Sequence, residues 1–382
     1  MKEWKTYKLG DIVNFTTGKL DSNAADINGK YPFFTCSPET LKINSFAFNQ
    51  KAILLAGNNA EGNFSVKYYE GKFNAYQRTY VISISDENVV DYKFLYYALK
   101  ICLLRFKMMS QGTSTKFLTK SILNSFEIDL PNIETQQSIA SILASIDSKI
   151  QINRQINDNL EQQAQALYKS WFVDFEPFKD GEFIESELGQ IPEGWQCIPF
   201  SMFVSESKAK TGKIGIKEYS VTNNGIFPRD AKYNKSLSQS STKNKLILYG
   251  DLVFGMSRDI LNWGVMQEEQ GGVSSAYTVY NINSGIVNST YLELFIKSRI
   301  HLFSDLIRPA AREGQGIDKS VLQTKVLLCP PQEVLDTFWP LYNSVTNQIQ
   351  RTTTEINFLG DVRDTLLPKL MSGELKINEI DC

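Results

Sequence analysis

The sequence predicts an α+β protein with two repeated α+β globules that alternate with two long helices, which pair as an antiparallel coiled coil. Three observations predict this fold class. Similar residues recur 199 positions apart, short β-forming runs precede a helical pattern in each copy, and each copy closes with a long stretch of heptad-spaced apolar residues. Those patterns are typical of a repeated domain, of mixed strand and helix, and of a coiled-coil seam respectively.

The internal repeat is the strongest of these signals. The residues from Lys120 to Leu123 recur as Lys319 to Leu322, and Pro131 matches Pro330 at the same offset. A repeat of roughly ninety residues is a domain plus a helix, not a solenoid unit. Two copies of one module can present related surfaces to a partner with twofold character, and DNA is the commonest such partner.

Each globule begins with short runs rich in aromatic and β-branched residues, separated by Gly, Asn and Asp. A helix and a short closing strand follow in both copies. The strands expected in the first copy are 12–15, 52–55, 64–69, 79–84 and 126–130, with a helix over 92–108. Those expected in the second are 245–249, 252–254, 275–282 and 325–328, with a helix over 291–307.

A long helix follows each globule, because apolar residues there alternate at spacings of four and three. The obvious cover for one helix is the other, packed antiparallel; the alternative is pairing with a second copy of the chain. Polar seam positions, among them Asn153, Asn157, Thr352 and Arg363, would fix the register. The predicted apolar seam comprises Ile139, Leu143, Ile146, Ile150, Leu160, Leu167, Phe338, Tyr342, Val345, Ile349, Ile356, Leu359 and Leu366.

These elements divide the chain into six parts. The globules are expected at 1–131 and 195–331, and the helices at 132–176 and 332–373. A connector rich in Pro, Gly and acidic residues occupies 177–194, and a tail occupies 374–382. Trp195 opens the second globule as Trp4 opens the first. Equal antiparallel rods would make the helix pair a ruler between the globules.

Charge alternates in step with the repeat. Overall net charge is −2, but residues 1–130 carry 16 Lys/Arg and 12 Asp/Glu, and residues 194–331 carry 16 and 11. The segments 132–193 and 332–382 are acidic, with 4 against 11 and 4 against 8. Two mildly basic globules are compatible with binding a polyanion. The five scattered cysteines fit a reducing compartment, and no apolar run reaches the roughly 20 residues that span a bilayer.

Particular motifs connect the chain to a known family. They are the segment from Ala166 to Phe175 (ALYKSWFVDF), the connector end from Ile191 to Trp195 (IPEGW) and the closing run from Leu366 to Leu375 (LLPKLMSGEL). With the two long helices, these resemble the specificity subunit of type I restriction–modification systems. The resemblance covers nearly the whole chain, although the globules match only in outline.

That resemblance implies a function without catalysis in this chain. Two target-recognition domains would each read one half of a split, asymmetric double-stranded DNA site, and the helix pair would set the gap. Two adenine-methyltransferase subunits and two motor–nuclease subunits would be the partners, in a prokaryotic cytoplasm. No cofactor is expected on this chain; S-adenosylmethionine, ATP and Mg²⁺ are expected on the partners.

The sequence itself offers no catalytic motif. It contains no G-x-x-x-x-G-K-[ST] loop for a nucleoside triphosphate. Its single histidine, His301, cannot build a His-based triad or multi-His metal site, so no metal is expected. The run Cys329-Pro330-Pro331-Gln332 lacks the leading Asn or Asp of an amino-methyltransferase motif, and prolines suit its strand-to-helix junction.

Candidate DNA contacts lie in loops that combine amide side chains, which read base edges, with Lys, Arg and hydroxyl groups, which hold phosphates. In the first globule they are Lys19, Asn58, Asn59, Lys72, Asn74, Gln77, Arg78, Gln111, Thr113, Ser114 and Lys116. In the second they are Lys208, Lys210, Lys213, Lys243, Asn244, Lys245, Arg258, Asp259, Arg312 and Gln315. Each loop also fits an ordinary turn.

Rival functions stay open at this point. A two-headed scaffold for a protein or polysaccharide partner would have the same architecture, and duplex-binding assays would separate it from a DNA reader. A self-contained restriction–methylation enzyme is disfavoured by the missing motifs. Within the family, the chain could serve in modification alone if no motor subunit accompanies it.

Overall fold

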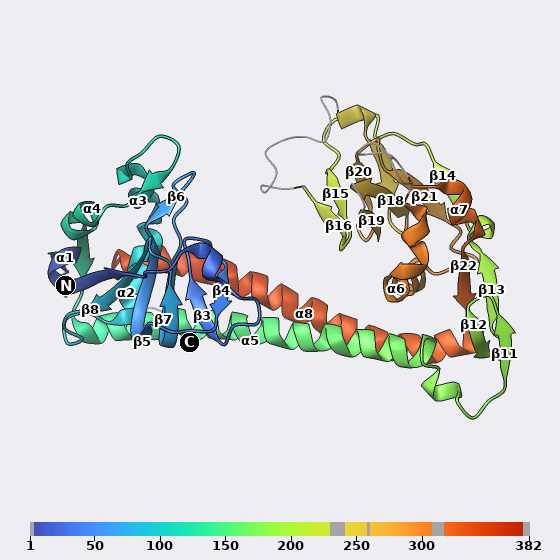
Figure 1. The fold of residues 1–382 in the computed structure, drawn as a ribbon, viewed down its shortest axis with the longest axis horizontal. Helices are drawn as coiled ribbons and strands as arrows, with labels where there is room; N and C mark the ends of the chain where they lie inside the picture. Colours follow the sequence, from blue (N-terminus) through green and yellow to red (C-terminus); the bar gives the residue numbers. More distant parts are fainter. Residues whose placement is uncertain (1–3, 230–240, 258–259, 308–316, 377–382) are drawn as a thin grey trace. The chain divides into compact units, whose positions relative to one another are not determined.

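The computed structural model describes residues 4–229, 241–257, 260–307 and 317–376 (Figure 1). The chain divides into two compact units. Unit 1 contains Met1–Asn159 and Gln348–Cys382, and unit 2 contains Leu160–Asn347. Each unit therefore holds one globule together with a part of each long helix.

A six-stranded sheet forms the frame of unit 1. Its strands pair antiparallel except β3 and β7, which are parallel. The order is β2-β8-β5-β7-β3-β4. The bounds are Val13–Thr17 for β2, Thr79–Ile84 for β8, Phe48–Ala56 for β5, Val66–Ala75 for β7, Tyr31–Phe34 for β3 and Thr40–Ile43 for β4.

Helices cover this sheet and a two-stranded ladder closes the globule. The ladder joins β1 (Lys5–Lys8) to β10 (Glu127–Leu130). The helix expected over 92–108 is broken at Cys102 into α2 (Tyr92–Ile101) and α3 (Leu103–Met109). Asp91 caps α2 by accepting a hydrogen bond from the Phe94 amide (2.8 Å), as an N-cap carboxylate should. The smaller elements are α1 (Leu9–Ile12), η1 (Ser22–Ala24), β6 (Asn58–Asn59), β9 (Lys116–Phe117) and α4 (Lys120–Ser125).

Unit 2 is built on a four-stranded sheet in the order β14-β21-β18-β19. These strands are Val204–Ser207, Thr278–Ile282, Leu252–Ser257 and Ile260–Val265. Its closing ladder joins β13 (Gln196–Pro199) to β22 (Val326–Cys329). The other elements are η3 (Phe200–Met202), β15 (Tyr219–Thr222), β16 (Gly225–Pro228), η4 (Ser241–Lys243), β17 (Lys245–Leu248), β20 (Gln270–Val273), α6 (Ser289–Ser298), η5 (Ile300–Leu306) and α7 (Lys319–Thr324).

The duplication predicted from the sequence is visible in the topology. The order β2-β8-β5-β7 of unit 1 corresponds to β14-β21-β18-β19 of unit 2. The ladders β1–β10 and β13–β22 have the same antiparallel pairing at matching places in the chain. The mixed α+β architecture used twice is therefore confirmed.

Two helices of 40 residues each follow the globules: α5 (Ile133–Phe172) and α8 (Gln332–Met371). In unit 1, Asp147 pairs with Arg363 (2.8 Å) and Asn157 donates to Thr353 Oγ1 (2.9 Å). The partner number falls as the α5 number rises, so the helices run antiparallel. α8 continues through Pro340 and Gly360, residues that weaken helix interiors.

The predicted seam residues are at least partly shielded from solvent. Within each unit every predicted seam position is buried or half-buried. In unit 2 the rings of Phe172 and Phe338 meet with centroids 4.7 Å apart. The two polar seam residues that make contacts across the pair in unit 1 are Asn157 and Arg363, whereas Thr352 donates to its own helix at Gln348 O (2.8 Å).

The connector between α5 and the second globule is ordered into a short 3-10 helix, η2 (Glu176–Phe178), and the hairpin β11 (Phe183–Ser186) with β12 (Gly189–Pro192). Trp195 packs edge-on against Phe175 and Phe178, with centroids 5.4 and 5.3 Å away. Among the described residues, no helix combines the length and apolarity that crossing a membrane requires.

Candidate nucleic-acid interface

In unit 1 the structure draws together loops that are far apart in the sequence. The loop after β2 meets the loop before β8 through a bridge between Leu20 and Tyr76, and the Gln77 amide donates to Leu20 O (2.9 Å). The loop after β5 joins them because the Gly57 amide donates to Arg78 O (2.8 Å). Three of the four predicted segments are therefore contiguous.

The fourth segment reaches the same surface through a small ladder. Asn58 and Asn59 of β6 pair with Phe117 and Lys116 of β9. Lys107 of α3 extends this contact by donating to Asn63 Oδ1 (2.8 Å). We call residues 18–21, 57–63, 76–78 and 111–117, with Lys107, the loop face of unit 1. Within unit 1, β6 and α3 lie at the end away from α5 and α8 (Figure 1).

Two glycines allow the loops to approach this closely. A Cβ on Gly18 would lie 1.7 Å from the Ala75 carbonyl oxygen, and one on Gly57 would lie 2.5 Å from the Arg78 carbonyl oxygen. Neither backbone could accept a larger residue without shifting. The glycines of the Gly18-Lys19 and Gly57-Asn58 pairs thus shape this surface, in addition to any contact that the pairs make with a ligand.

The side chains of the unit 1 loop face differ in their exposure and in whether their polar groups already have hydrogen-bond partners. Lys19, Arg78, Gln111, Thr113 and Ser114 are exposed, and Lys116 is half-buried. Other candidates already have structural partners. Asn59 Oδ1 accepts from the amides of Glu61 and Asn63, Asn58 Oδ1 accepts from the Cys36 thiol (3.0 Å), and Gln77 Nε2 donates to Asp21 (3.3 Å).

Two candidates of the first globule lie on β7, outside the loop face. Lys72 is exposed and its ammonium sits over the Phe46 ring, 4.9 Å from the centroid. Asn74 is only 4% exposed, and its Nδ2 donates to Ser45 O (3.4 Å). A buried amide with an internal partner holds the backbone together and does not offer an edge to a base.

Unit 2 has a corresponding but smaller grouping. The segment after β14 lies beside the segment before β17: Lys210 bridges Lys245, the Thr211 amide donates to Asn244 O (3.0 Å), and the Gly212 amide donates to Thr242 O (3.3 Å). We call residues 208–213 and 241–245 the loop face of unit 2. The exposed cations here are Lys208, Lys210, Lys213 and Lys243.

The remaining candidates of unit 2 have other surroundings. Lys245 is half-buried and donates to Tyr277 O, and burial lowers its pKa. Asn244 is 1% exposed and donates to Glu218 Oε1 (2.9 Å), so its amide supports the loop from inside. Arg258, Asp259, Arg312 and Gln315 lie outside the described residues.

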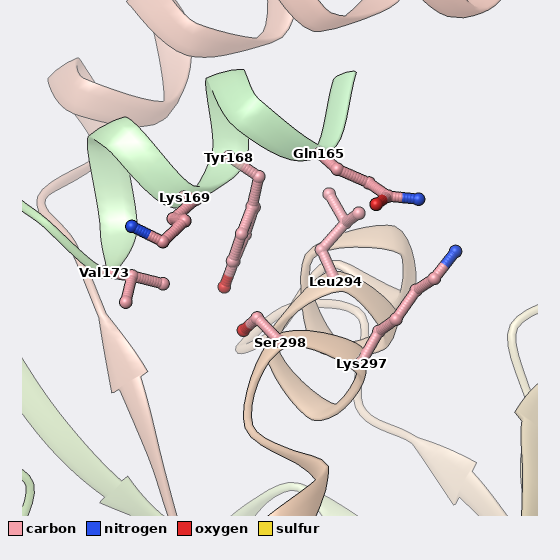
Figure 2. Close-up of a pocket in the computed structure, with 7 residues that line it drawn as sticks. All are labelled: Gln165, Tyr168, Lys169, Val173, Leu294, Lys297 and Ser298. Atoms are coloured by element: carbon pink, nitrogen blue, oxygen red, sulfur yellow. The ribbon is translucent and has the colours of Figure 1, made fainter. Parts of the chain in front are cut away.

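A cavity of about 340 Å³ lies elsewhere in unit 2, between the last turns of α5 and α6 (Figure 2). Tyr168 extends from α5 toward Ser298 of α6, and burial raises its pKa to about 12. The matching positions of unit 1, Leu367 and Leu99, belong to its core. The other lining residues are Gln165, Lys169, Val173, Leu294 and Lys297.

In the described part of the chain, no group of three or more His, Cys, Asp or Glu residues could hold a metal ion. His301 is exposed on η5. Cys329 and its two prolines lie at the junction of β22 and α8, as the sequence suggested.

Sequence reasoning missed two residues of the unit 1 loop face. Lys107 falls inside the helix predicted over 92–108, and Phe117 directly follows the candidate Lys116. Phe117 is 37% exposed and stacks with Arg78, whose guanidinium carbon is 5.6 Å from the ring centroid. A signal was present, because an aromatic among cationic and amide residues is typical of nucleic-acid surfaces.

Comparison with known proteins finds similarity to type I specificity subunits. The family model for the type I restriction modification DNA specificity domain matches residues 1–162. The EcoDI specificity subunit of Escherichia coli is 36% identical over 219 residues, which are 52% of this chain and 48% of that protein. The MjaIX specificity subunit of Methanocaldococcus jannaschii is 28% identical over 315 residues, which are 78% and 72%. The chain thus spans about half the length of the first of these relatives.

A solved structure shares the fold over nearly the full length. The crystal structure of the S subunit of a type I restriction–modification system from M. genitalium matches with a TM-score of 0.58 at 16% identity, covering 96% of each chain. This match shows a shared architecture. The evidence that the chain is related to specificity subunits comes from the sequence matches. Residues 1–162 therefore carry the type I DNA specificity domain, and the chain is a relative of the specificity subunits of type I restriction enzymes.

Proposed function

We propose that this chain is the DNA sequence-recognition subunit of a type I restriction–modification enzyme, and that each loop face contacts one half of a split site. The observation that carries the proposal is the convergence in unit 1 of four loops, distant in sequence, into one surface. That surface exposes Lys19, Arg78 and Lys107, and the relatives named above are specificity subunits.

Contacts on the two faces divide into positioning and reading. Exposed lysines suit phosphate contacts, since an ammonium on a flexible side chain binds a negative charge whatever the identity of the neighbouring base. In unit 1, Arg78, Gln77 and Gln111 carry the donors and acceptors that can read a major-groove edge. In unit 2 the exposed groups described are mainly lysines, so this face supports the phosphate contacts of its half-site.

The helix pair would set the spacing between the two half-sites. Support comes from the equal lengths of α5 and α8 and from their antiparallel pairing inside each unit. Inserting one heptad into both helices is expected to lengthen the unread gap, or to abolish activity, without changing either half-site. Altered half-sites with an unchanged gap would contradict this role.

Catalysis is assigned to partners. Methyltransferase subunits, which bind S-adenosylmethionine, would methylate an adenine in each half-site, and motor–nuclease subunits would use ATP and Mg²⁺. This chain would bind none of these cofactors and would work beside the partner subunits in a prokaryotic cytoplasm. A complex without motor subunits would act in modification alone.

Methylation sequencing tests the proposal directly. The chain would be expressed with an adenine-methyltransferase subunit of a type I system, in a host without adenine methylation of its own. We expect methylated adenines in one split, asymmetric motif, and none when this chain is omitted. If the same motif appeared without the chain, recognition would belong to another subunit. The scaffold alternative, which the relatives do not favour, predicts no effect of this chain on methylation.

A further inference from the structure

Phe117 is an apolar side chain held in the open on a polar surface. It is 37% exposed, whereas the core residues of unit 1 are at most 8% exposed. It belongs neither to the core clusters of the described residues nor to the apolar residues packed against them. The ring is therefore not part of the described core of unit 1.

The backbone beneath the ring is firmly fixed. The Phe117 amide donates to Gln111 O (2.8 Å), and the Gln111 amide donates to Phe117 O (3.0 Å). The next amide, Leu118, donates to Gly57 O (2.9 Å), and Phe117 pairs with Asn58 in the β6–β9 ladder. A ring on so constrained a segment loses little entropy when it meets a ligand.

Gly112 completes the support. Its φ is +109°, a conformation that favours glycine, and a Cβ there would lie 2.0 Å from the Thr115 carbonyl oxygen. The same Cβ would lie 3.4 Å from Cδ2 of the Phe117 ring. The tight turn between Gln111 and Phe117 thus positions the Phe117 ring as well as the backbone.

One cation contacts the ring directly, and two more belong to the same loop face. The Arg78 guanidinium stacks over it, and Lys116 precedes it in β9. Lys107 is anchored to Asn63 in the neighbouring loop. A ring beside several cations would sit against bases when those cations hold the phosphates on either side.

We propose that Phe117 is a specificity-determining residue, whose ring makes an apolar contact with a base of the half-site read by unit 1, while Arg78 holds the ring in place. The inference rests on the proposed DNA-recognition function. Apolar side chains contact bases through the thymine methyl group or by inserting beside a base step. Either contact would make this position depend on the identity of the base.

The test uses the full chain and a pool of random DNA duplexes. Duplexes bound by the wild type would be selected and sequenced, and affinity for the enriched duplex measured by fluorescence anisotropy. For Phe117→Ala we expect about a tenfold loss of affinity for that duplex and lost preference in one half only, because a base contact is removed. Affinity for a scrambled duplex should change less than about twofold, because phosphate contacts remain.

Two further variants complete the design. Phe117→Leu keeps an apolar side chain and should retain part of the preference, which also covers the case in which Phe117→Ala folds poorly. Phe358→Ala removes a more exposed phenylalanine (64%) on α8 of the same unit and should bind as the wild type does. If Phe117→Ala and Phe117→Leu enriched the wild-type motif with wild-type affinity, this inference would be wrong. If the wild type enriched no motif, the proposed function itself would fail.

Discussion

The four strands β2-β8-β5-β7 of unit 1 and β14-β21-β18-β19 of unit 2 have the same order, but the two units surround them differently. Unit 1 extends its sheet with β3 and β4, whereas unit 2 adds the separate ladders β15–β16 and β17–β20. The closing ladders and the helices α4 and α7 stay alike. The difference shows that variation is concentrated in the loops and added strands, where recognition is proposed, and spares the closing ladders and the short helices beside them.

A second difference lies at the joint between each globule and the long helices. In unit 1, α2 and α8 are packed by Leu99 and Leu367, which are 0% and 6% exposed. At the matching place in unit 2, Ser298 and Tyr168 border the cavity of Figure 2. Tyr168 is itself buried in the core of unit 2, so the two joints differ at Ser298, which is exposed and borders the cavity.

Exchanging these residues should give the largest effect. Leu99→Ser removes a fully buried side chain and leaves a hydroxyl in an apolar site, which should lower the free energy of unfolding by about 3–4 kcal/mol. Ser298→Leu, in the roomier joint, should change it by less than about 1 kcal/mol. Urea unfolding followed by circular dichroism measures both. Equal losses from the two changes would mean that the joints are packed alike.

A polar network distinguishes the units next. In unit 1, Asp147 accepts from Tyr97 Oη and from Arg363 Nη1, both at 2.8 Å, and so ties α2, α5 and α8 together. The positions 199 residues away are Ile296, Thr346 and Ala164, which cannot form such a network. Burial and the Asp147 carboxylate raise the pKa of Tyr97, which marks the hydroxyl as a donor throughout the physiological range.

Asp147→Ala should lower the free energy of unfolding by about 2 kcal/mol. The change leaves a guanidinium and a phenol without their shared acceptor in a partly buried site. Thr346→Ala, its counterpart in unit 2, should cost less than about 1 kcal/mol, because among the described residues that hydroxyl donates to carbonyls of its own helix. Unfolding in urea compares the two variants under identical conditions. A Thr346→Ala loss as large as that of Asp147→Ala would contradict the assignment of the network to unit 1.

The two loop faces should be separable in their effects on DNA. Gln77→Ala is expected to relax or abolish the half-site read by unit 1 only, at about 1–3 kcal/mol if a bidentate base contact is lost. Lys243→Ala in unit 2 should instead weaken binding evenly and reduce the salt dependence, as loss of a phosphate contact does. Methylation maps and salt titrations report these outcomes. If the maps were unchanged in Gln77→Ala, the assignment of this loop to base reading would be wrong.

Much of this architecture could be predicted from the sequence because it depends on local periodicity. The 4-3 spacing of apolar residues predicted both long helices, and the 199-residue offset predicted the repeated frame. Short strands were harder: β3 contains Pro32 and β19 is interrupted by Asn262 and Gly264, so neither has an uninterrupted β-forming run. The break at Cys102 was not predicted, because the apolar pattern continues through it.

The loop face depends on contacts between distant residues, which no local pattern encodes. Asn74 and Gln77 are candidates from the same segment of the sequence, but the fold buries Asn74 and leaves Gln77 exposed. The ladder between Asn58 and Phe117 joins residues 59 positions apart, and this pairing brings the aromatic ring to the surface that also carries Arg78. Residue type therefore identified the loops, and tertiary pairing decided which of their side chains are exposed.

Within the helix pair, the two equivalent seam residues Asn153 and Thr352 give the smallest expected effect. Both are buried, at 2% and 4% exposure, but Thr352 donates to Gln348 O, whereas Asn153 Nδ2 has no hydrogen-bond partner among the described residues. An unpaired buried amide is destabilising, and such a residue can still fix the register of a coiled coil. Asn153→Leu should therefore raise the free energy of unfolding by about 1 kcal/mol. Urea unfolding measures the gain, and a destabilised Asn153→Leu would mean that the amide is satisfied in solution.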